Sequence, residues 1–315
     1  MKIVFLDAAT LGDDLTYTAF EEIGEVIVYP TTSEAEFASH IEGADVAVIN
    51  KQKMNSQNLP MAKNLKLICL AATGFDNVDL AYCRSVGIGV CNVVGYSTQS
   101  VAQLTLSMAL SLYTHLNEYT EFVRSGEYTQ KGIANRLIPV YHEIAGKTWG
   151  IVGYGNIGRQ VAQVAQAMGC RVLIYKRTPI EGLDCVNFDT ICQKSDILSL
   201  HVPLNEQTRN LLDAEHIGML KKDAIVINVA RGAVADEEAL ADAVLNGEIG
   251  GIGIDVYSKE PFDAEHPFNK IKHFPNVLLT PHMAWGGYET RVRLLGEIKE
   301  NILAFFKNES RCRVD

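Results

Sequence analysis

The stretch KTWGIVGYGNIGRQVAQVAQAMGCRVLIYKRT, residues 147–178, decides the fold. A short apolar run at residues 149–152 leads into Gly153, Gly155 and Gly158. A segment with helical periodicity and a second apolar run at residues 171–175 follow. The order strand, G-x-G-x-x-G, helix, strand is typical of a βαβ unit that binds a dinucleotide. The alternative is an ordinary tight turn, and the position of the glycines between strand and helix argues against it.

Each glycine has a steric role in such a unit. Gly153 permits the tight turn, Gly155 lets the backbone approach a pyrophosphate, and Gly158 lets the helix pack close to the strand. The free N–H groups at the helix N-terminus carry partial positive charge and favour an anion. We therefore expect the pyrophosphate of a dinucleotide on this loop.

The residues after the second strand bear on the choice of dinucleotide. An NAD site usually places Asp or Glu about 20 residues beyond the glycines, where the carboxylate accepts hydrogen bonds from the ribose. This chain has Lys176, Arg177 and Thr178 instead. Two cations and a hydroxyl can bind a 2′-phosphate that a carboxylate would repel, so we expect NADP(H) to be preferred. Two alternatives stay open: the cations are only a solvated strand end, or the acid-less site also accepts NAD(H).

Composition limits the class of protein. The 315 residues, 47% hydrophobic and 21% charged, favour two globular domains. A net charge of -10 argues against nucleic-acid and anionic-membrane partners. Met1 leads directly into an apolar run without the features of a signal peptide, and polar residues interrupt the apolar run at 100–116. We expect a cytoplasmic protein with reduced thiols, since none of the seven cysteines forms a C-x-x-C pair, and we assign no metal site.

The pattern along the chain predicts an α/β protein with two doubly wound parallel-sheet domains, Rossmann- or flavodoxin-like, and a cleft between them. Strands are predicted at residues 2–6, 26–29, 45–49, 67–70 and 89–91, and again, besides the two of the opening stretch, at 197–201, 224–229, 251–256 and 277–280. A long helix is expected from Ser97 or Thr98 to about Tyr119, and an irregular arm at 126–138. The final helix, 288–306, is expected to return to the first domain. This organisation predicts a substrate domain of residues 1–98 plus 287–315 and a dinucleotide-binding domain of residues 99–286, with a hinge at 95–101 and 285–291.

Polar residues follow three strands of the second domain. Arg231 follows the strand 224–229, Asp255 and Glu260 lie at and beyond the end of 251–256, and His282 follows 277–280. Ligands of doubly wound folds bind beyond the carboxyl ends of the strands. An arginine binds a carboxylate bidentately, a histidine transfers protons near neutral pH, and a glutamate can fix its tautomer. Each residue alone is more often structural, but their arrival together beside a dinucleotide motif favours catalysis.

Several separated motifs make the chain similar to one known family. They are AATGFDNVDL (71–80), GIVGYGNIG (150–158), HVPLNEQT (201–208), INVARGAVADEEAL (227–240), GIDVYSKEP (253–261) and TPHMAW (280–285). Nearly the whole chain resembles the D-2-hydroxyacid dehydrogenases (D-isomer specific). The segments NVVGYSTQSVAQ and PHMAW look most like the branch of glycerate dehydrogenases, hydroxypyruvate reductases and glyoxylate reductases.

The resemblance implies roles for individual residues. Arg231 would hold the substrate carboxylate and carbonyl, His282 would be the acid/base, and Glu260 its partner. Thr73 and Gly74 would bind the substrate through a loop of the other domain, and Thr73 would also approach the nicotinamide. The cofactor would contact the three glycines, Lys176, Arg177, Thr178, Arg231 and His282. Asp255 would bind the nicotinamide carboxamide. The resemblance also implies cofactor contacts from Thr73, Tyr154, Asn156, Ile157, His201, Val202, Pro203, Thr208, Val229, Ala230 and Ala284.

The resemblance implies reduction of a small 2-oxo acid, of the hydroxypyruvate or glyoxylate type, by hydride from NAD(P)H. Rival substrates on the same machinery are pyruvate, phenylpyruvate and 3-phosphoglycerate, although the chain lacks room for the regulatory domain of many phosphoglycerate dehydrogenases. A rival of another class is a sensor or corepressor that binds the cofactor without turnover. By analogy we expect a homodimer whose contact comes from residues 100–138, although their apolar faces equally fit a core.

Overall fold

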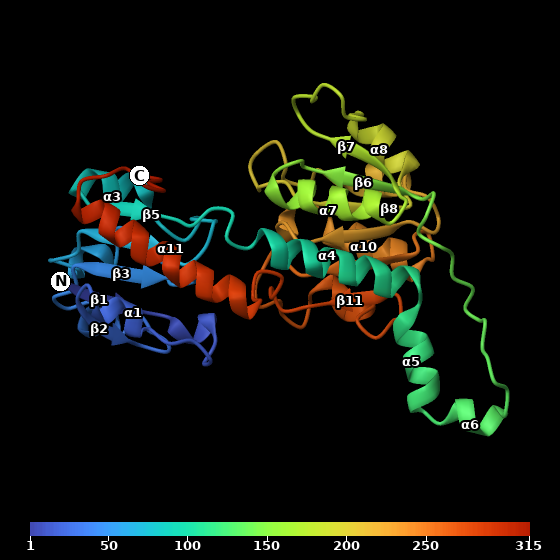
Figure 1. The fold of residues 1–315 in the computed structure, drawn as a ribbon, viewed down its shortest axis with the longest axis horizontal. Coiled ribbons are helices and arrows are strands. Elements are labelled where there is room, and N and C mark those ends of the chain that lie inside the picture. Colours follow the sequence, from blue (N-terminus) through green and yellow to red (C-terminus); the bar gives the residue numbers. More distant parts are fainter. The chain divides into compact units, whose positions relative to one another are not determined.

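The computed structural model describes all 315 residues. The chain forms two compact units, Met1–Ser97 with Gly286–Asp315, and Thr98–Trp285 (Figure 1). It passes from one unit to the other at residues 97/98 and 285/286. These crossings lie one residue before the boundaries expected from the sequence.

The first unit is built on a five-stranded parallel sheet in the order β2-β1-β3-β4-β5. Its strands are β1 (Lys2–Phe5), β2 (Glu25–Val28), β3 (Val46–Ile49), β4 (Leu67–Leu70) and β5 (Gly89–Cys91). Every residue of β3 and β4 is buried, because helices and loops cover both faces of a parallel sheet. The edge strand β2 stays partly exposed.

The helices of the first unit are short except for the last. They are η1 (Ala8–Leu11), α1 (Thr18–Glu21), α2 (Phe37–His40), η2 (Leu59–Met61), α3 (Leu80–Val86) and α11 (Tyr288–Phe306). Helix α11 has the predicted bounds and packs on β4, where it buries Leu294, Ile298 and Ile302 (Figure 1). The end of the chain thus belongs to the first unit.

The second unit has a six-stranded parallel sheet in the order β11-β10-β9-β8-β6-β7. Its strands are β6 (Thr148–Val152), β7 (Arg171–Tyr175), β8 (Ile197–Leu200), β9 (Ile225–Asn228), β10 (Gly251–Ile254) and β11 (Val277–Leu279). The predicted class, two doubly wound parallel sheets, is confirmed. In the second sheet the strand order reverses between β6 and β8, which is where such folds bind ligands.

Two helical layers cover this sheet. Helices α4 (Thr98–Tyr113) and α7 (Asn156–Ala167) lie side by side on one face (Figure 1). The opposite face is covered by α8 (Phe188–Lys194), α9 (Ala214–Gly218) and α10 (Glu237–Leu245). Alternate strand residues enter the two cores: Ile151 belongs to the first and Val152 to the second. Short helices η3 (Gly232–Val234) and η4 (Pro267–Lys270) complete the unit.

The prediction of one helix to about Tyr119 is wrong. Helix α4 ends at Tyr113, and α5 (Leu116–Arg124) starts after His115, whose φ of 52° is left-handed. A left-handed residue stops the α-helical path, and Thr114 bonds back to Leu110 O with 2.7 Å between Oγ1 and O. The segment 126–138, predicted to be irregular, also holds a short helix, α6 (Glu127–Lys131). Helices α5 and α6 and the extended loop after them project from the body of the second unit (Figure 1), and residues 116–140 are called the arm below.

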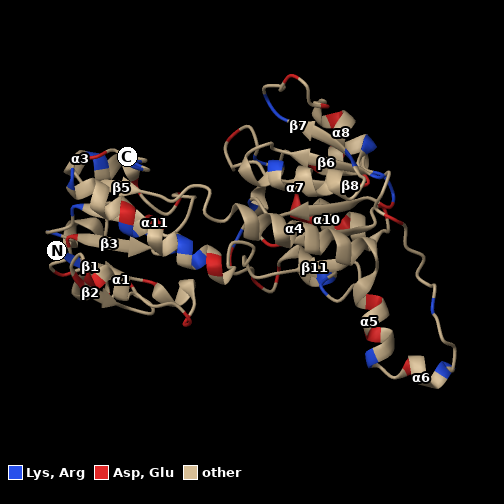
Figure 2. Cartoon of the chain, in the orientation of Figure 1, with Lys and Arg blue, Asp and Glu red and all other residues tan.

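All seven cysteines are free: five are buried, Cys185 is half-buried and Cys312 is exposed. None of the helices combines the length and the apolar character that crossing a membrane requires. The acids and bases are scattered over the helices and loops of both units (Figure 2).

Candidate active site

The glycine loop follows β6, beside the point where the strand order reverses. Gly153 has a φ of 97°, and a Cβ there would lie 2.8 Å from the carbonyl carbon of His201, which follows β8. A Cβ on Gly158 would lie 2.0 Å from the carbonyl oxygen of Gly153. Both glycines are therefore required by close backbone contacts within the unit.

Gly155 is different, because apart from its own chain neighbours no protein atom lies within 4 Å of where its Cβ would be. It is the N-cap residue of α7, and no side chain caps the helix there. The first N–H groups of α7 thus border open space and can bind an anion. Tyr154 and Ile157 are half-buried around this loop, and Asn156 is exposed. The loop fits the pyrophosphate of a dinucleotide.

The end of β7 lies against the same loop, since Gly153 N donates to Tyr175 O at 2.9 Å. Lys176, Arg177 and Thr178 follow and are all exposed. In Figure 2 the segment directly after β7 is blue, the colour of Lys and Arg. The Arg177 guanidinium donates to Gln207 Oε1 at 3.1 Å, in the segment after β8. Two cations thus stand at the strand end where other members of this fold type place an acid.

The end of β8 carries His201 and a chain of hydrogen bonds. Trp149 Nε1 donates to Ser199 Oγ at 2.9 Å, and Ser199 Oγ lies 2.9 Å from His201 Nε2. Burial lowers the pKa of His201 to about 3, so the imidazole is neutral, and its buried Nδ1 has no partner. Val202 would touch a Cβ on Gly153. Pro203 O accepts a bond of 2.6 Å from Thr208 Oγ1, which shapes the following turn.

The end of β9 carries Val229, Ala230 and Arg231. The buried Asn228 holds their turn, because its Nδ2 donates to Arg231 O at 3.0 Å and its Oδ1 accepts from Ala230 N at 3.1 Å. Val229 and Ala230 are buried, and the Arg231 guanidinium donates to Ala230 O at 2.8 Å. The arginine is therefore presented beyond the strand on a turn with its own hydrogen bonds.

The loop after β10 brings Glu260 to His282. Glu260 Oε1 accepts from Tyr257 N at 3.0 Å, and Oε2 lies 2.6 Å from His282 Nδ1. A Cβ on Gly232 would lie 2.0 Å from the carbonyl carbon of Tyr257, so the Arg231 turn packs directly against this loop. The ends of β9, β10 and β11 thus meet through backbone packing and one carboxylate–imidazole pair.

His282 lies in a left-handed turn after β11, with a φ of 53°. The buried Asp255 organises this turn: Oδ1 accepts from Thr280 Oγ1 at 2.6 Å and from Met283 N at 2.8 Å, and Oδ2 accepts from Ala284 N at 2.9 Å. Burial raises the pKa of Asp255 although these donors favour the carboxylate. The cofactor contact expected of Asp255 stays a prediction, and the structure shows that Asp255 holds the His282 turn.

Thr73 and Gly74 follow β4 in the first unit. Thr73 Oγ1 donates to Val93 O at 2.7 Å, and Asn77 Nδ2 fastens the loop to Gln52 O at 2.8 Å. Sequence reasoning missed Asp7, whose carboxylate accepts the N–H groups of residues 50–52 at 2.6 to 3.0 Å, at the point where this sheet's strand order reverses. Burial raises the pKa of Asp7. An acid directly after an apolar strand was the available signal.

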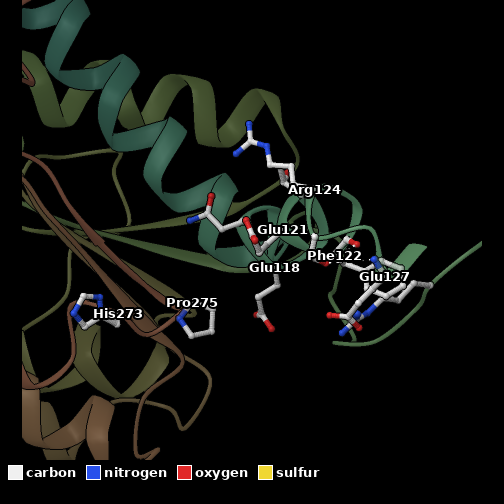
Figure 3. A pocket seen from close by; sticks show the side chains of 11 residues that line it. Glu118, Glu121, Phe122, Arg124, Glu127, His273 and Pro275 are labelled. Atoms are coloured by element: carbon white, nitrogen blue, oxygen red, sulfur yellow. Dashed lines mark hydrogen bonds between the residues drawn. The ribbon is translucent and has the colours of Figure 1, made fainter. Parts of the chain in front are cut away.

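A separate hollow of about 630 Å³ lies between the arm and the segment before β11 (Figure 3). It is lined by acidic side chains such as Glu118 and Glu121, together with His273 and Pro275. None of the predicted site residues lines it. It therefore has no part in the chemistry of the strand ends.

Comparison with known proteins decides the family. Residues 106–284 match the family model described as D-isomer specific 2-hydroxyacid dehydrogenase, NAD binding domain. A glycerate dehydrogenase of Methylorubrum extorquens is 37% identical over 306 residues, 96% of each chain. The chain belongs to the D-isomer specific 2-hydroxyacid dehydrogenases.

Other relatives of this dehydrogenase include hydroxypyruvate reductases and glyoxylate reductases. A solved D-lactate dehydrogenase of Aquifex aeolicus, complexed with NAD and lactic acid, is 28% identical with a TM-score of 0.85 over 98% of this chain and 96% of the other. A solved acyclic imino acid reductase in complex with NADPH and D-Arg is 27% identical with a TM-score of 0.85 over 100% of both chains. A pyridine nucleotide-binding domain is therefore present, and both nucleotides occur in structures of this fold.

Gly155 and Gly158, two of the three glycines of the loop, make a matched pair of substitutions. Gly155→Ala places a methyl group in open space, so we expect a thermal midpoint near that of the parent protein and at least about tenfold weaker dinucleotide binding, from steric exclusion of the ligand. Gly158→Ala drives a methyl group into Gly153 O, so we expect a clear loss of thermal stability. Calorimetry with and without NADPH or NADH checks both. Unchanged nucleotide affinity in Gly155→Ala would contradict the assigned role.

Proposed function

We propose that this dehydrogenase reduces a small 2-oxo acid, of the hydroxypyruvate or glyoxylate type, to the D-2-hydroxy acid. The observation that carries the proposal is the Glu260–His282 pair, with 2.6 Å between Oε2 and Nδ1, on a loop that packs against the Arg231 turn. A carboxylate–imidazole pair beside an arginine supplies proton transfer and carboxylate binding at one edge of the sheet. The glycerate dehydrogenase among the relatives supports this substrate class.

The side chains divide the work as follows. Arg231 holds the substrate carboxylate through its planar fork of donors, which a point charge cannot replace. Glu260 accepts a hydrogen bond from the Nδ1–H group of His282, which leaves the Nε2–H group to deliver its proton to the developing alkoxide. A bound NADPH supplies the hydride. Stabilising the alkoxide in a site of low dielectric accounts for a large part of the expected rate.

We assign the second unit to the cofactor and the first unit to the substrate. The glycine loop and the strand ends that carry Arg231, Glu260 and His282 all belong to the second unit. The first unit would contribute Thr73 and Gly74, with backbone N–H groups directed at the substrate carboxylate. Turnover of a 2-oxo acid by the purified protein would exclude the rival function, a sensor or corepressor without catalysis.

The catalytic assignments predict two severe losses. His282→Ala removes the proton donor, so kcat should fall by about 10²- to 10⁴-fold. Arg231→Lys removes bidentate binding, so kcat/KM should fall by at least about tenfold. Steady-state oxidation of NADPH with hydroxypyruvate, glyoxylate, pyruvate and phenylpyruvate measures both and ranks the substrates. His273→Ala, an exposed histidine of the hollow in Figure 3, is the control. Near-parent kcat/KM in either site variant would refute the assigned roles.

We further propose that NADPH is preferred over NADH. Support comes from Lys176, Arg177 and Thr178, which replace the ribose-binding acid of NAD sites, and from the link between Arg177 and Gln207. The protein carries a net charge of -10, so a local pair of cations is needed to hold a phosphate.

The cofactor preference has its own test. Arg177→Ala removes a charge-assisted contact worth about 1.5–3 kcal/mol, so kcat/KM for NADPH should fall by about ten- to a hundredfold while the value for NADH changes little. Arg171→Ala, at the start of β7, breaks an exposed pair with Asp184 in the loop after that strand, and it should leave both values unchanged. A parent enzyme that prefers NADH would sink this proposal.

We also propose a homodimer formed through the arm. Leu137 and Ile138 are 74% and 71% exposed, and Leu116, Val123, Ile133 and Val140 are each more than half exposed. So many exposed aliphatic side chains on one arm are typical of a surface that a partner covers. A second copy of the chain fits, because most closed oligomers pair identical surfaces about a twofold axis.

Light scattering should therefore give twice the chain mass of 34.6 kDa. Leu137→Asp together with Val123→Asp should shift the protein towards monomer, since a charge cannot be buried unpaired in an apolar contact. Val86→Asp, an exposed valine at the end of α3, is the matched control and should stay dimeric. A strictly monomeric parent at micromolar concentration would end the proposal.

A further inference from the structure

Glu237 is a nearly buried carboxylate that the proposed mechanism does not use. It is the first residue of α10, and its side chain is only 11% exposed. Its Oε1 accepts from Ser258 N at 2.9 Å, and its Oε2 accepts from Ser258 Oγ. Ser258 lies in the loop that carries Glu260, two residues before it. Both carboxylate oxygens therefore bond one residue of the catalytic loop.

A buried histidine completes the set of donors. His266 Nε2 lies 3.2 Å from Glu237 Oε2, and His266 Nδ1 accepts from Phe268 N at 3.3 Å. Because Nδ1 is an acceptor, Nε2 carries the proton and donates it to the carboxylate. The imidazole is only 6% exposed and packs among the rings of Tyr257, Phe262 and Phe268. The buried charge of Glu237 is thus compensated by three donors.

These contacts are not needed to start the helix. Asp236 is the N-cap of α10, and its carboxylate accepts from Ala239 N at 3.0 Å. The next acid, Glu238, pairs with Lys270 on the surface with 57% of its side chain exposed. Glu237 alone among these three acids is directed at the loop of Glu260. Its contacts therefore hold that loop and do not serve to start the helix.

The loop transmits its position to the catalytic pair. Tyr257 N bonds Glu260 Oε1 at 3.0 Å, and Tyr257 OH bonds Thr280 O at 2.9 Å, two residues before His282. The Arg231 turn rests on the same segment, since a Cβ on Gly232 would lie 2.1 Å from Ser258 N. Holding Ser258 in place therefore fixes the backbone that presents Glu260 and borders Arg231.

We propose that Glu237 is a positioning residue that aligns Glu260 with His282 by clamping Ser258. The inference rests on the function proposed above. It assigns Glu237 no contact with substrate or cofactor. The clamp works because a carboxylate can accept from the amide, the hydroxyl and the imidazole at once, whereas a glutamine amide brings its own N–H groups to face some of these donors.

The variant Glu237→Gln should loosen the loop and misplace Glu260. We expect kcat to fall by about tenfold or more, because small displacements of a catalytic group cost large rate factors, while KM and nucleotide affinity stay within about twofold. The upper limb of the pH–rate profile should move to lower pH, since loss of a bonded carboxylate disfavours the imidazolium that donates the proton. Glu260 and Asp255 are the acids that act on His282. The charged groups near Glu237 itself are Glu206, Arg209, Asp236 and Glu238, which line a surface hollow together with Glu237.

A double-mutant cycle in the full-length protein tests the route of the effect. If Glu237 acts through Glu260, Glu237→Gln should reduce kcat by less than about twofold in a Glu260→Gln background. Glu238→Gln, on the same turn of α10, is the matched control and should keep parent kinetics. Ser258→Ala removes only the hydroxyl bond and should give a smaller loss in the same direction. It tests the clamp even when Glu237→Gln does not fold.

The outcomes separate two failures. A parent protein that turns over no 2-oxo acid overturns the proposed function, and this inference with it. An active parent whose Glu237→Gln variant keeps the kcat and pH profile overturns the inference alone. The inference alone is also overturned if Glu237→Gln lowers kcat by the same factor in the parent and in the Glu260→Gln background. An equal loss would mean that the substitution acts independently of Glu260, for example by lowering the stability of the fold.

Discussion

The site of this dehydrogenase depends on one buried carboxylate. Asp255 accepts hydrogen bonds from Thr280, Met283 and Ala284, and so closes the turn after β11 around His282. His282 has a left-handed backbone, which a residue with a Cβ adopts only where its surroundings compensate the strain. Three charge-assisted bonds to a buried acid supply that compensation. Asp255 thus fixes the backbone of the turn, and Glu260 orients the imidazole that the turn carries.

Carboxylates are used in the same way at neighbouring strand ends. Glu260 links the loop after β10 to His282, and Glu237 links α10 to that loop. In the first unit, Asp7 gathers the N–H groups that follow β3. Each acid follows a buried strand or starts a helix, and each bonds a segment distant in sequence. Loops without regular structure thereby gain fixed positions on rigid sheets, which catalytic geometry requires.

The glycine loop leaves room for a ligand at only one of its three glycines. Gly153 and Gly158 are enclosed by backbone atoms, whereas the space at Gly155 stays open before the first N–H groups of α7. The sheet places His201 against this loop with a neutral ring, because burial depresses its pKa. Positive charge comes from the end of β7, where Lys176 and Arg177 are exposed. A neutral imidazole and an exposed pair of cations therefore both lie close to the glycine loop.

Much of the fold could be predicted from the sequence. Parallel strands buried on both faces read as apolar runs, so β4, β5, β7 and α11 were located to the residue. The glycine loop and the polar residues Arg231, Glu260 and His282 were also visible, since motifs of this kind are local in sequence. The helix break at His115 was missed, because the apolar period continues through Leu112, Leu116 and Tyr119 and does not register a single left-handed residue.

What the sequence by itself determined was therefore the class of fold and the family, and it indicated the residues to which we assign the chemistry. Only the tertiary structure decided how those residues are held. Asp255 to Met283, Glu237 to Ser258 and Trp149 to Ser199 join residues 20 or more positions apart. No periodicity or spacing encodes such pairs. They form because a buried polar group must find a partner, and packing of the strands and helices determines which partner is within reach.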